Sequence, residues 1–279
     1  MFSDDIEKEI KKHFEKQNNT GLEEFDGISP NQMHYLLREP FAKQSIIKLN
    51  RLSEQQYQSI PLLNQIKYLV KSIGNETEVK LTKTGALPTK IVKDTYHNGG
   101  LTEEFIEEGY TFLRRESDSH TIQLSRILLE LIGFTKKRNN KLSLTKKAKK
   151  ILENDHRLLE LVFTAFCQEF NWGYFDGYEL DEWGQYGVGF SLMLLHKYGS
   201  LKRKDSFYAE KYYKAFPDLL DFHPFTPEIK NSAYRGYAFR TFEKGLSYFG
   251  FIDYERGRIF DPSYVIKTRL FDAFISVKA

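Results

Sequence analysis

The sequence predicts a mainly helical chain with short β-hairpins. The best-formed stretch, residues 127–155, opens with apolar residues at helical spacing, and Gly133 ends that pattern. An extended run, a polar turn at residues 136–140 and a return strand follow before a second helix. Two further stretches, residues 79–96 and 242–275, repeat parts of this order. Irregular spacing between the copies indicates duplicated small domains rather than a solenoid.

Length and composition indicate a globular chain of two or three domains. It has 279 residues, of which 41% are hydrophobic and 15% aromatic, enough to bury a core in each domain. The single cysteine, Cys167, lies in an apolar helical setting and cannot form an internal disulfide. No segment approaches the ~20 apolar residues of a membrane span, and the first residues are charged. We therefore expect a soluble, cytoplasmic protein without a membrane partner.

Charge is segmented along the chain although the net charge is only +3. Residues 136–150 hold eight basic side chains and no acid, whereas residues 160–190 hold six acids, ten aromatics and no lysine or arginine. A small net charge does not predict a nucleic-acid partner, but a local basic run is compatible with one.

Helix start signals recur in the N-terminal part. An amphipathic helix is expected at residues 4–16, and Ser29 followed by Pro30 has the residue types of a cap and a first helical position. Ser53 starts another helical stretch, which resumes after Pro61 and closes at Gly74.

The repeated stretches share a strand followed by a threonine that can cap the next helix. Thr82 takes this place in the first copy and Thr145 in the second. In the third copy a helix ends at Gly250, a strand and turn follow, and Ile259 and Phe260 begin the return strand. A final helix is expected at residues 268–275.

The order in residues 127–155 resembles the wing region of bacterial MarR-type winged-helix regulators. Gly133-Phe134 and Leu144-Thr145 match the family pattern, while Ala148 replaces a glycine that the first copy keeps as Gly85. The resemblance implies tandem winged-helix-like units joined by helices. We expect N-terminal helices plus a first unit at 1–98, a second unit at 99–155, and a helical region followed by a third unit at 156–279.

Residues 62–96 also resemble part of a group of plasmid- and mobile-element-associated bacterial proteins. Their shared core is the stretch LTKTGALP. This resemblance implies no activity.

The basic run gives the first candidate site. A wing tip could contact phosphates, and each contact would add salt-sensitive affinity. Lysines in a first helical turn oppose the helix dipole, which favours anions there. A simple solvated face is the alternative interpretation. The candidates are Lys136, Lys137, Arg138, Lys141, Lys146 and Lys147.

A winged helix reads bases through the helix that precedes its hairpin. In the second unit this helix is expected at residues 119–131, and in the third at 231–247. The side chains they would offer are Gln123, Ser125 and Arg126, and then Tyr234, Arg235, Tyr237, Arg240 and Lys244. Arg256 and Arg258 in the last turn join the candidate contacts. Tyrosine and arginine serve protein interfaces equally well.

The acidic, aromatic connection at residues 171–189 allows a third interpretation. Its carboxylates, Asp176, Glu179, Asp181 and Glu182, could hold a hard cation, yet no calcium-loop spacing fixes them. A structural loop is the favoured interpretation. No nucleophile motif, phosphate-binding loop or dinucleotide fingerprint occurs, so no cofactor or catalytic residue is predicted.

These observations favour a non-enzymatic nucleic-acid-binding protein, for which regulation is one candidate role. The expected partner is DNA. The alternative is a protein-interaction scaffold, with a protein partner or self-association. A metal-dependent enzyme using the acidic connection ranks third.

Overall fold

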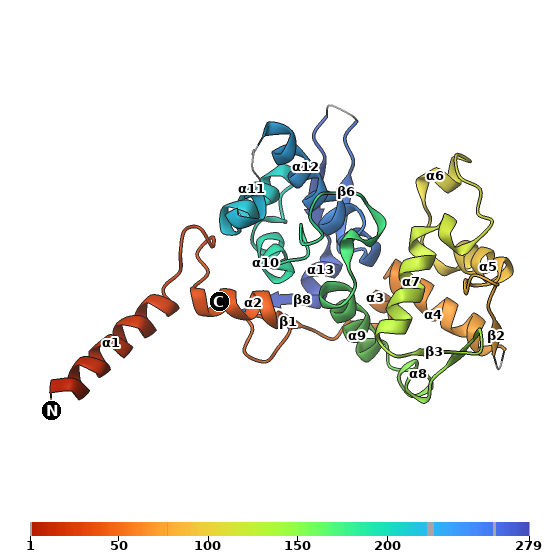
Figure 1. The fold of residues 1–279 in the computed structure, drawn as a ribbon, viewed down its shortest axis with the longest axis horizontal. Helices are drawn as coiled ribbons and strands as arrows, with labels where there is room; N and C mark the ends of the chain where they lie inside the picture. The colour runs from red at the N-terminus through yellow and green to blue at the C-terminus, as the bar shows by residue number, and fades with distance from the viewer. Residues whose placement is uncertain (1, 77, 222–225, 259–260, 279) are drawn as a thin grey trace. The chain divides into compact units, whose positions relative to one another are not determined.

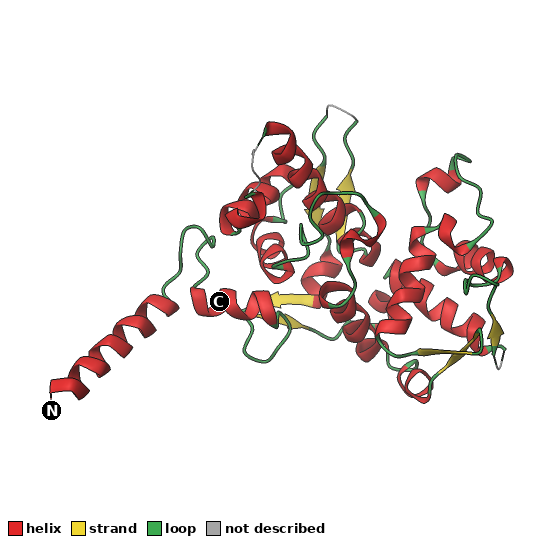
Figure 2. Ribbon diagram, in the orientation of Figure 1, coloured by secondary structure: helices red, strands yellow, loops and turns green. Residues whose placement is uncertain are grey.

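The computed structural model describes residues 2–76, 78–221, 226–258 and 261–278. Helices dominate, as predicted, and the described residues hold thirteen α-helices with eight short strands in three antiparallel sheets (Figures 1 and 2). The chain forms two compact units. Unit 1 comprises Met1–Asn50, Trp172–Gly245 and Ile252–Ala279, and unit 2 comprises Arg51–Asn171 and Leu246–Phe251.

Unit 1 begins with α1 (Phe2–Asn19) and α2 (Pro30–Arg38). The predicted cap is confirmed, because the Ser29 side chain accepts a hydrogen bond from the backbone N–H of Gln32, and the Gln32 side chain accepts one in return from the Ser29 backbone in a capping box. Strand β1 (Ile47–Leu49) then pairs antiparallel with β8 (Ile275–Val277), near the other end of the chain.

The second sheet of unit 1 has strand order β5-β7-β6. It joins β5 (Arg203–Lys204), β6 (Ile252–Glu255) and β7 (Tyr264–Lys267), with Tyr254 opposite Val265. The helices around it are α10 (Val188–Tyr198), α11 (Asp205–Ala215), α12 (Pro227–Ala238) and α13 (Arg269–Phe274). The final helix, expected at residues 268–275, spans Arg269–Phe274 with Thr268 as its N-cap, and Ile275 begins β8; Ile259 and Phe260 lie outside the described residues.

Aromatic side chains fill the core of unit 1. Tyr208, Tyr212, Tyr237 and Phe242 are fully buried. The rings of Tyr212 and Tyr237 lie 4.6 Å apart, and those of Tyr237 and Phe242 meet edge to face at 5.6 Å. This packing fixes α11 against α12 and its π-helical continuation, Phe239–Glu243.

Unit 2 contains one sheet with strand order β2-β4-β3. Its strands are β2 (Val79–Lys80), β3 (Thr135–Arg138) and β4 (Lys141–Leu144). Its helices are α3 (Glu54–Gln58), α4 (Pro61–Gly74), α5 (Thr89–Gly99), α6 (Glu104–Glu107), α7 (His120–Leu131), α8 (Lys146–Ile151) and α9 (Asp155–Gln168). The core is aliphatic along α4 and α7, and Phe163 packs edge to face on Phe249 at 5.1 Å.

Two local predictions in unit 2 need correction. Thr82 does not cap the next helix, because its hydroxyl and backbone nitrogen bond Ala86 in a tight turn, and α5 begins only at Thr89. The polar turn is also shorter than predicted. It is formed by Asn139 and Asn140, both with positive φ, a conformation that asparagine tolerates well.

The two three-stranded sheets have the same topology. In unit 2 the order is α4, β2, α5 to α7, β3, β4 and α8, and in unit 1 it is α10, β5, α11, α12, β6, β7 and α13. In each sheet the last strand along the chain lies in the middle. The expected division at residue 98 cuts across one of these sheets. Val79, in the first expected copy, pairs with Leu142, in the second. These two stretches therefore build a single sheet.

Candidate nucleic-acid interface

A groove in unit 1 lies between α12, the start of α11 and the β6–β7 hairpin. It has a volume of about 810 Å³. Its lining brings together Arg235, Arg256 and Arg258, three of the sequence-predicted cations, and adds Lys204. Both arginines that follow β6 are exposed, as is Arg235 on α12. The groove therefore presents guanidinium groups from a helix and from a hairpin.

Acidic and aromatic side chains share the same groove. Arg256 Nη1 lies 3.5 Å from Glu243 Oε1, so this arginine is partly neutralised. Asp205, at the first position of α11, accepts a 3.0 Å hydrogen bond from the Tyr254 hydroxyl. Burial raises the pKa of Asp205 and, more strongly, the pKa of Tyr254. The remaining acid, Asp261, belongs to the hairpin.

Arg240 does not belong to this interface, and the prediction that it contacts nucleic acid is wrong. The residue is 2% exposed. Its Nε and Nη2 atoms donate to the two carboxylate oxygens of Asp176, at 2.8 and 2.6 Å. Its Nη1 atom donates to the carbonyl oxygens of Leu180, Asp181 and Trp183. Arg240 thus fixes the acidic connection that precedes α10.

The other side chains predicted to contact nucleic acid from residues 231–247 differ in how far they are buried. Tyr237 is buried, and its hydroxyl lies 3.1 Å from Ser191 Oγ. Tyr234 is half-buried and stacks on Tyr213, with ring centres 5.5 Å apart. Lys244 follows the π-helical segment and lies over the Phe239 ring. Arg235 is the α12 arginine that remains available to a partner.

Unit 2 carries its predicted cations on strand β3 and in the adjacent hairpin. Lys136, Lys137 and Arg138 are all exposed and lie in the strand itself rather than in the turn. Lys141 Nζ pairs with Glu78 Oε2 at 2.7 Å. This hydrogen bond lowers the pKa of Glu78, helped by attraction from Lys136 and Arg138. The hairpin is therefore a strongly cationic surface with one carboxylate at its edge.

The lysines that follow β4 form a separate basic group. Thr145 caps α8 as predicted, with its Oγ1 3.2 Å from the backbone nitrogen of Ala148. Lys146 and Lys147 are exposed and line a shallow depression of about 540 Å³, together with Lys150 and Arg157. No acidic side chain lines this depression among the described residues.

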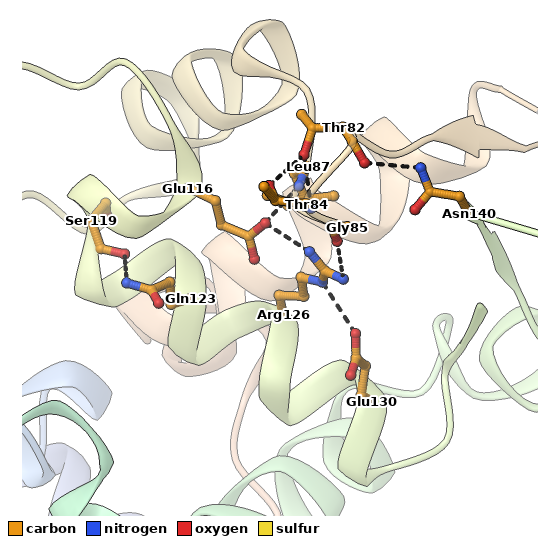
Figure 3. A network of polar contacts seen from close by, with 11 residues as sticks. Thr82, Thr84, Gly85, Leu87, Glu116, Ser119, Gln123, Arg126, Glu130 and Asn140 are labelled. Carbon is orange, nitrogen blue, oxygen red and sulfur yellow. Dashed lines mark hydrogen bonds and ion pairs between the residues drawn. The ribbon is translucent and has the colours of Figure 1, made fainter.

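The helix predicted to read bases in unit 2 has its polar side chains already engaged (Figure 3). Arg126 donates to Glu116 at 2.7 Å, to Glu130 at 3.1 Å and to the carbonyl oxygen of Gly85 at 3.0 Å. Ser125 is buried. The predicted base contacts of α7 are therefore not supported by its geometry.

The N-terminus of α7 is occupied by a side chain that the sequence did not single out. Glu103 accepts hydrogen bonds from the backbone nitrogens of His120 and Thr121, at 3.1 and 3.2 Å, and from the Ser119 hydroxyl. A carboxylate in this position takes the place that a phosphate would favour. In unit 2 the hairpin, rather than this helix, offers the surface for a polyanion.

The acidic connection supports the structural interpretation given to it. Asp176 is engaged with Arg240, and Glu179 accepts a 2.7 Å hydrogen bond from the Ser232 hydroxyl. Within the part of the chain that the structure describes, no three His, Cys, Asp or Glu side chains are grouped to hold a metal. Cys167 is buried, and burial raises the pKa of its thiol, so the thiolate is disfavoured.

Comparison of the chain with family models, curated proteins and solved structures gives no match. The described helices include none with the length and apolar character needed to cross a bilayer.

Proposed function

We propose that the chain is a non-enzymatic nucleic-acid-binding protein built on two winged-helix units, with DNA as the partner and regulation as one candidate role. The topology supports the fold assignment. Counted from α4 in unit 2 and from α10 in unit 1, a short strand follows the first helix and a β-hairpin follows the third main helix, and the short strand pairs with the last strand of the hairpin. This is the order of elements in a winged helix.

The observation that carries the proposal is the groove of unit 1. It joins exposed arginines from the helix before the hairpin and from the hairpin itself, namely Arg235, Arg256 and Arg258. Guanidinium groups bind phosphates with two parallel hydrogen bonds and bind guanine edges in the same way. A duplex lying along the groove would meet both elements at once.

The cationic hairpin of unit 2 supplies a second contact for the same kind of ligand. Lys136 and Arg138 are exposed on one face of β3 and can reach phosphates of the same ligand, while Lys137 is exposed on the opposite face. Each neutralised phosphate releases counterions and steepens the dependence of affinity on salt by ~0.9 in log–log slope.

The test is binding of a mixed-sequence DNA duplex, measured by fluorescence anisotropy at a series of salt concentrations. We expect salt-sensitive binding by the wild-type chain. Arg256→Glu with Arg258→Glu should lower affinity at low salt at least ~10-fold and flatten the salt slope, because phosphate contacts become repulsive. Lys136→Glu with Arg138→Glu should act in the same direction through unit 2.

The matched control reverses two exposed lysines beside the β1–β8 sheet, Lys43 and Lys278, to glutamate. Its charge change equals that of each test pair, so it measures the effect of net charge alone. Absence of binding at low salt, or an equal loss of affinity in the control, would contradict the proposal.

One observation favours the second candidate, a protein-interaction scaffold. Phe105, Tyr110 and Phe112 of unit 2 are 58%, 74% and 68% exposed. Exposed aromatic groups with polar neighbours are typical of protein interfaces. If wild-type chain fails to bind duplex DNA at low salt, the scaffold is the function that remains. Phe105→Ser with Phe112→Ser should leave DNA binding unchanged under the leading proposal.

A further inference from the structure

The groove of unit 1 contains aromatic rings as well as cations. Its described lining includes three exposed arginines and three half-buried rings. The arginines are Arg235, Arg256 and Arg258, and the rings are those of Tyr178, Phe239 and Tyr254. A surface that contacts only the phosphates of a duplex needs the cations but has no use for the rings. The rings therefore indicate contact with another part of the nucleic acid.

The groove is a hollow in the protein, which is the reverse of the usual contact with paired DNA. Duplex recognition places a protein helix or hairpin inside a groove of the DNA, so the protein projects at the contact. The volume of about 810 Å³ instead falls in the range of pockets that enclose a small molecule, roughly 300–1,000 Å³. A nucleotide that has left its base pair is the part of a DNA molecule that can enter such a hollow.

The ring of Tyr178 is held in a fixed position. Arg240, which holds the surrounding connection, has its Cζ atom 5.7 Å from the centre of this ring. A Cβ added to Gly236 of α12 would lie 3.2 Å from Tyr178 Cγ, so the ring packs directly on the helix. The centre of the Phe239 ring lies 6.0 Å from that of Tyr178. A planar group that stacks on rings already fixed in place loses little free energy to side-chain ordering.

Carboxylates in the groove determine which end of a nucleotide enters. Asp205 and Glu243 line the groove and are half-buried. Asp205 accepts a 3.0 Å hydrogen bond from the hydroxyl of Tyr254, which keeps the carboxylate beside an aromatic ring. A phosphate would be repelled here, whereas the exocyclic amino group of a base can donate to a carboxylate. The base is therefore the end that enters, and the phosphates stay with the exposed arginines.

We propose that the groove of unit 1 binds an unpaired nucleotide of the DNA. Its base stacks on the adjoining rings of Tyr178 and Phe239, and its flanking phosphates contact Arg256 and Arg258. This inference rests on the proposed nucleic-acid-binding function and adds to it a preference for DNA with unpaired bases. It also gives the acidic, aromatic connection, which carries Tyr178, a place in the binding site.

The first experiment compares two DNA probes of equal length by fluorescence anisotropy at one salt concentration. One probe is a fully paired duplex, and the other has a central run of mismatched base pairs. Both carry the same number of phosphates, so counterion release favours neither. We expect the wild-type chain to bind the mismatched probe at least about 5-fold more tightly, the lower end of what stacking of one base contributes.

Variants of Tyr178 test the stacking site. Tyr178→Leu should remove the preference and leave affinity for the paired duplex within about 2-fold of wild type, because leucine is apolar but offers no ring face. Tyr178→Phe keeps the ring and should keep the preference. Urea denaturation checks that each variant is folded. Phe239→Leu is a second test of the same site, and it should also weaken the preference.

The matched control is Tyr174→Leu. Tyr174 lies in the same connection as Tyr178, is 62% exposed and is outside the described lining of the groove. This variant should keep the preference for the mismatched probe. Arg256→Glu with Arg258→Glu should instead lower affinity for both probes, because both depend on phosphate contacts.

A photocrosslink tests the same contact in the wild-type chain. 5-Iododeoxyuridine placed in the mismatched run forms a covalent bond under ultraviolet light with an aromatic side chain that stacks on it. Peptide mass spectrometry then identifies the residue. We expect Tyr178 or Phe239, and a crosslink confined to residues outside the groove would contradict the proposal.

The outcomes separate this inference from the function on which it rests. Equal affinity for the two probes would overturn the inference and leave the proposed function standing. Absence of binding to either probe at low salt would contradict the proposed function, and the inference with it. A preference that Tyr178→Leu and Phe239→Leu both leave intact would place the unpaired base elsewhere. Displacement of the mismatched probe by deoxynucleoside monophosphates at a similar concentration would assign the groove to a free nucleotide and also overturn the proposal.

Discussion

Arg235 and Arg240 are five residues apart, and the two side chains do opposite things. Arg235 is exposed and lines the groove, whereas Arg240 is buried and is held by Asp176 and by three carbonyl oxygens. A five-residue step turns a helix by about 140°, so the two side chains leave it on different sides. Residue type alone could not separate a ligand-binding arginine from a structural one.

This difference gives a pair of variants with separable effects. Arg240→Ala should lower the free energy of unfolding by ~3–5 kcal/mol, because it leaves the buried Asp176 carboxylate without its partner. Arg235→Ala should stay within ~0.5 kcal/mol of wild type and weaken duplex binding instead. Urea denaturation and anisotropy measure the two properties. Equal stability of the two variants would contradict the buried role of Arg240.

At the scale of single elements, local chemical signals predicted most boundaries. Ser29 and Thr145 accept the cap hydrogen bonds expected of them, and the helices predicted to start at Ser53 and Thr268 begin one residue later with these side chains as caps. Capping depends on residues within one turn, so it can be read from adjacent sequence. The cations of the unit 2 hairpin could also be predicted from the sequence, because they too lie within a few residues of one another.

Pairing between distant strands was not predictable. Strands β2 and β5 are two residues long and carry no periodic signal, yet each completes a three-stranded sheet. Lys204 lines the groove because it lies on β5. The sequence does not predict this position, because it does not predict β5. The groove became visible only once β5, α12 and the hairpin were placed together in space.

The glycine between α7 and β3 has a testable conformational role. Gly133 has φ +69°, and its backbone nitrogen donates to Glu130 O at 3.0 Å. A Cβ added there would lie 4.0 Å from Lys147 Nζ, so space does not limit substitution. Gly133→Ala should therefore cost ~1–2 kcal/mol of stability from backbone strain alone.

Two controls make this prediction specific. Gly133→Asn should cost less than Gly133→Ala, because asparagine tolerates the left-handed region. Gly177→Ala, where φ is not positive and a Cβ would have no atom within 4 Å, should change stability by no more than ~0.5 kcal/mol. Urea denaturation of all three variants provides the comparison. A Gly133→Ala variant as stable as wild type would show that the turn relaxes.

At the scale of the whole molecule, the predicted domains are consecutive ranges of the sequence, whereas unit 1 is assembled from separated parts of the chain. Strand β1 pairs with β8 more than two hundred residues later, with Ile47 opposite Val277. Asp26 in the N-terminal part reaches Lys197 and Lys211. Such contacts between distant parts of the chain cannot be predicted from the sequence, because ion pairs and the pairing of edge strands do not alter the local spacing of apolar residues.

Asp26 makes this closure dependent on pH. Burial acts to raise its pKa, but hydrogen bonds from Lys197, Lys211 and Tyr198 outweigh burial and hold the pKa below the ordinary value of 3.8. A carboxylate with a lowered folded pKa stabilises the fold above its unfolded pKa, and this stabilisation is lost as pH falls through the folded pKa.

Asp26→Asn should therefore lower the free energy of unfolding at neutral pH by ~2 kcal/mol, the range for hydrogen bonds to charged groups. Asparagine keeps the shape and accepts the positive φ of 55° at this position, so charge is the property that changes. The difference from wild type should shrink as pH falls below about 3.8, because the unfolded chain then binds a proton at Asp26 before the folded chain does, and it should be lost once pH falls below the lower folded pKa. Urea denaturation across a pH series measures this convergence.

Glu23→Gln, which removes an exposed ion pair with Lys214, is the control and should stay close to wild type throughout, because exposed pairs contribute little. A gap between Asp26→Asn and wild type that stays constant to low pH would show that packing, rather than the carboxylate charge, holds the N-terminal segment in unit 1.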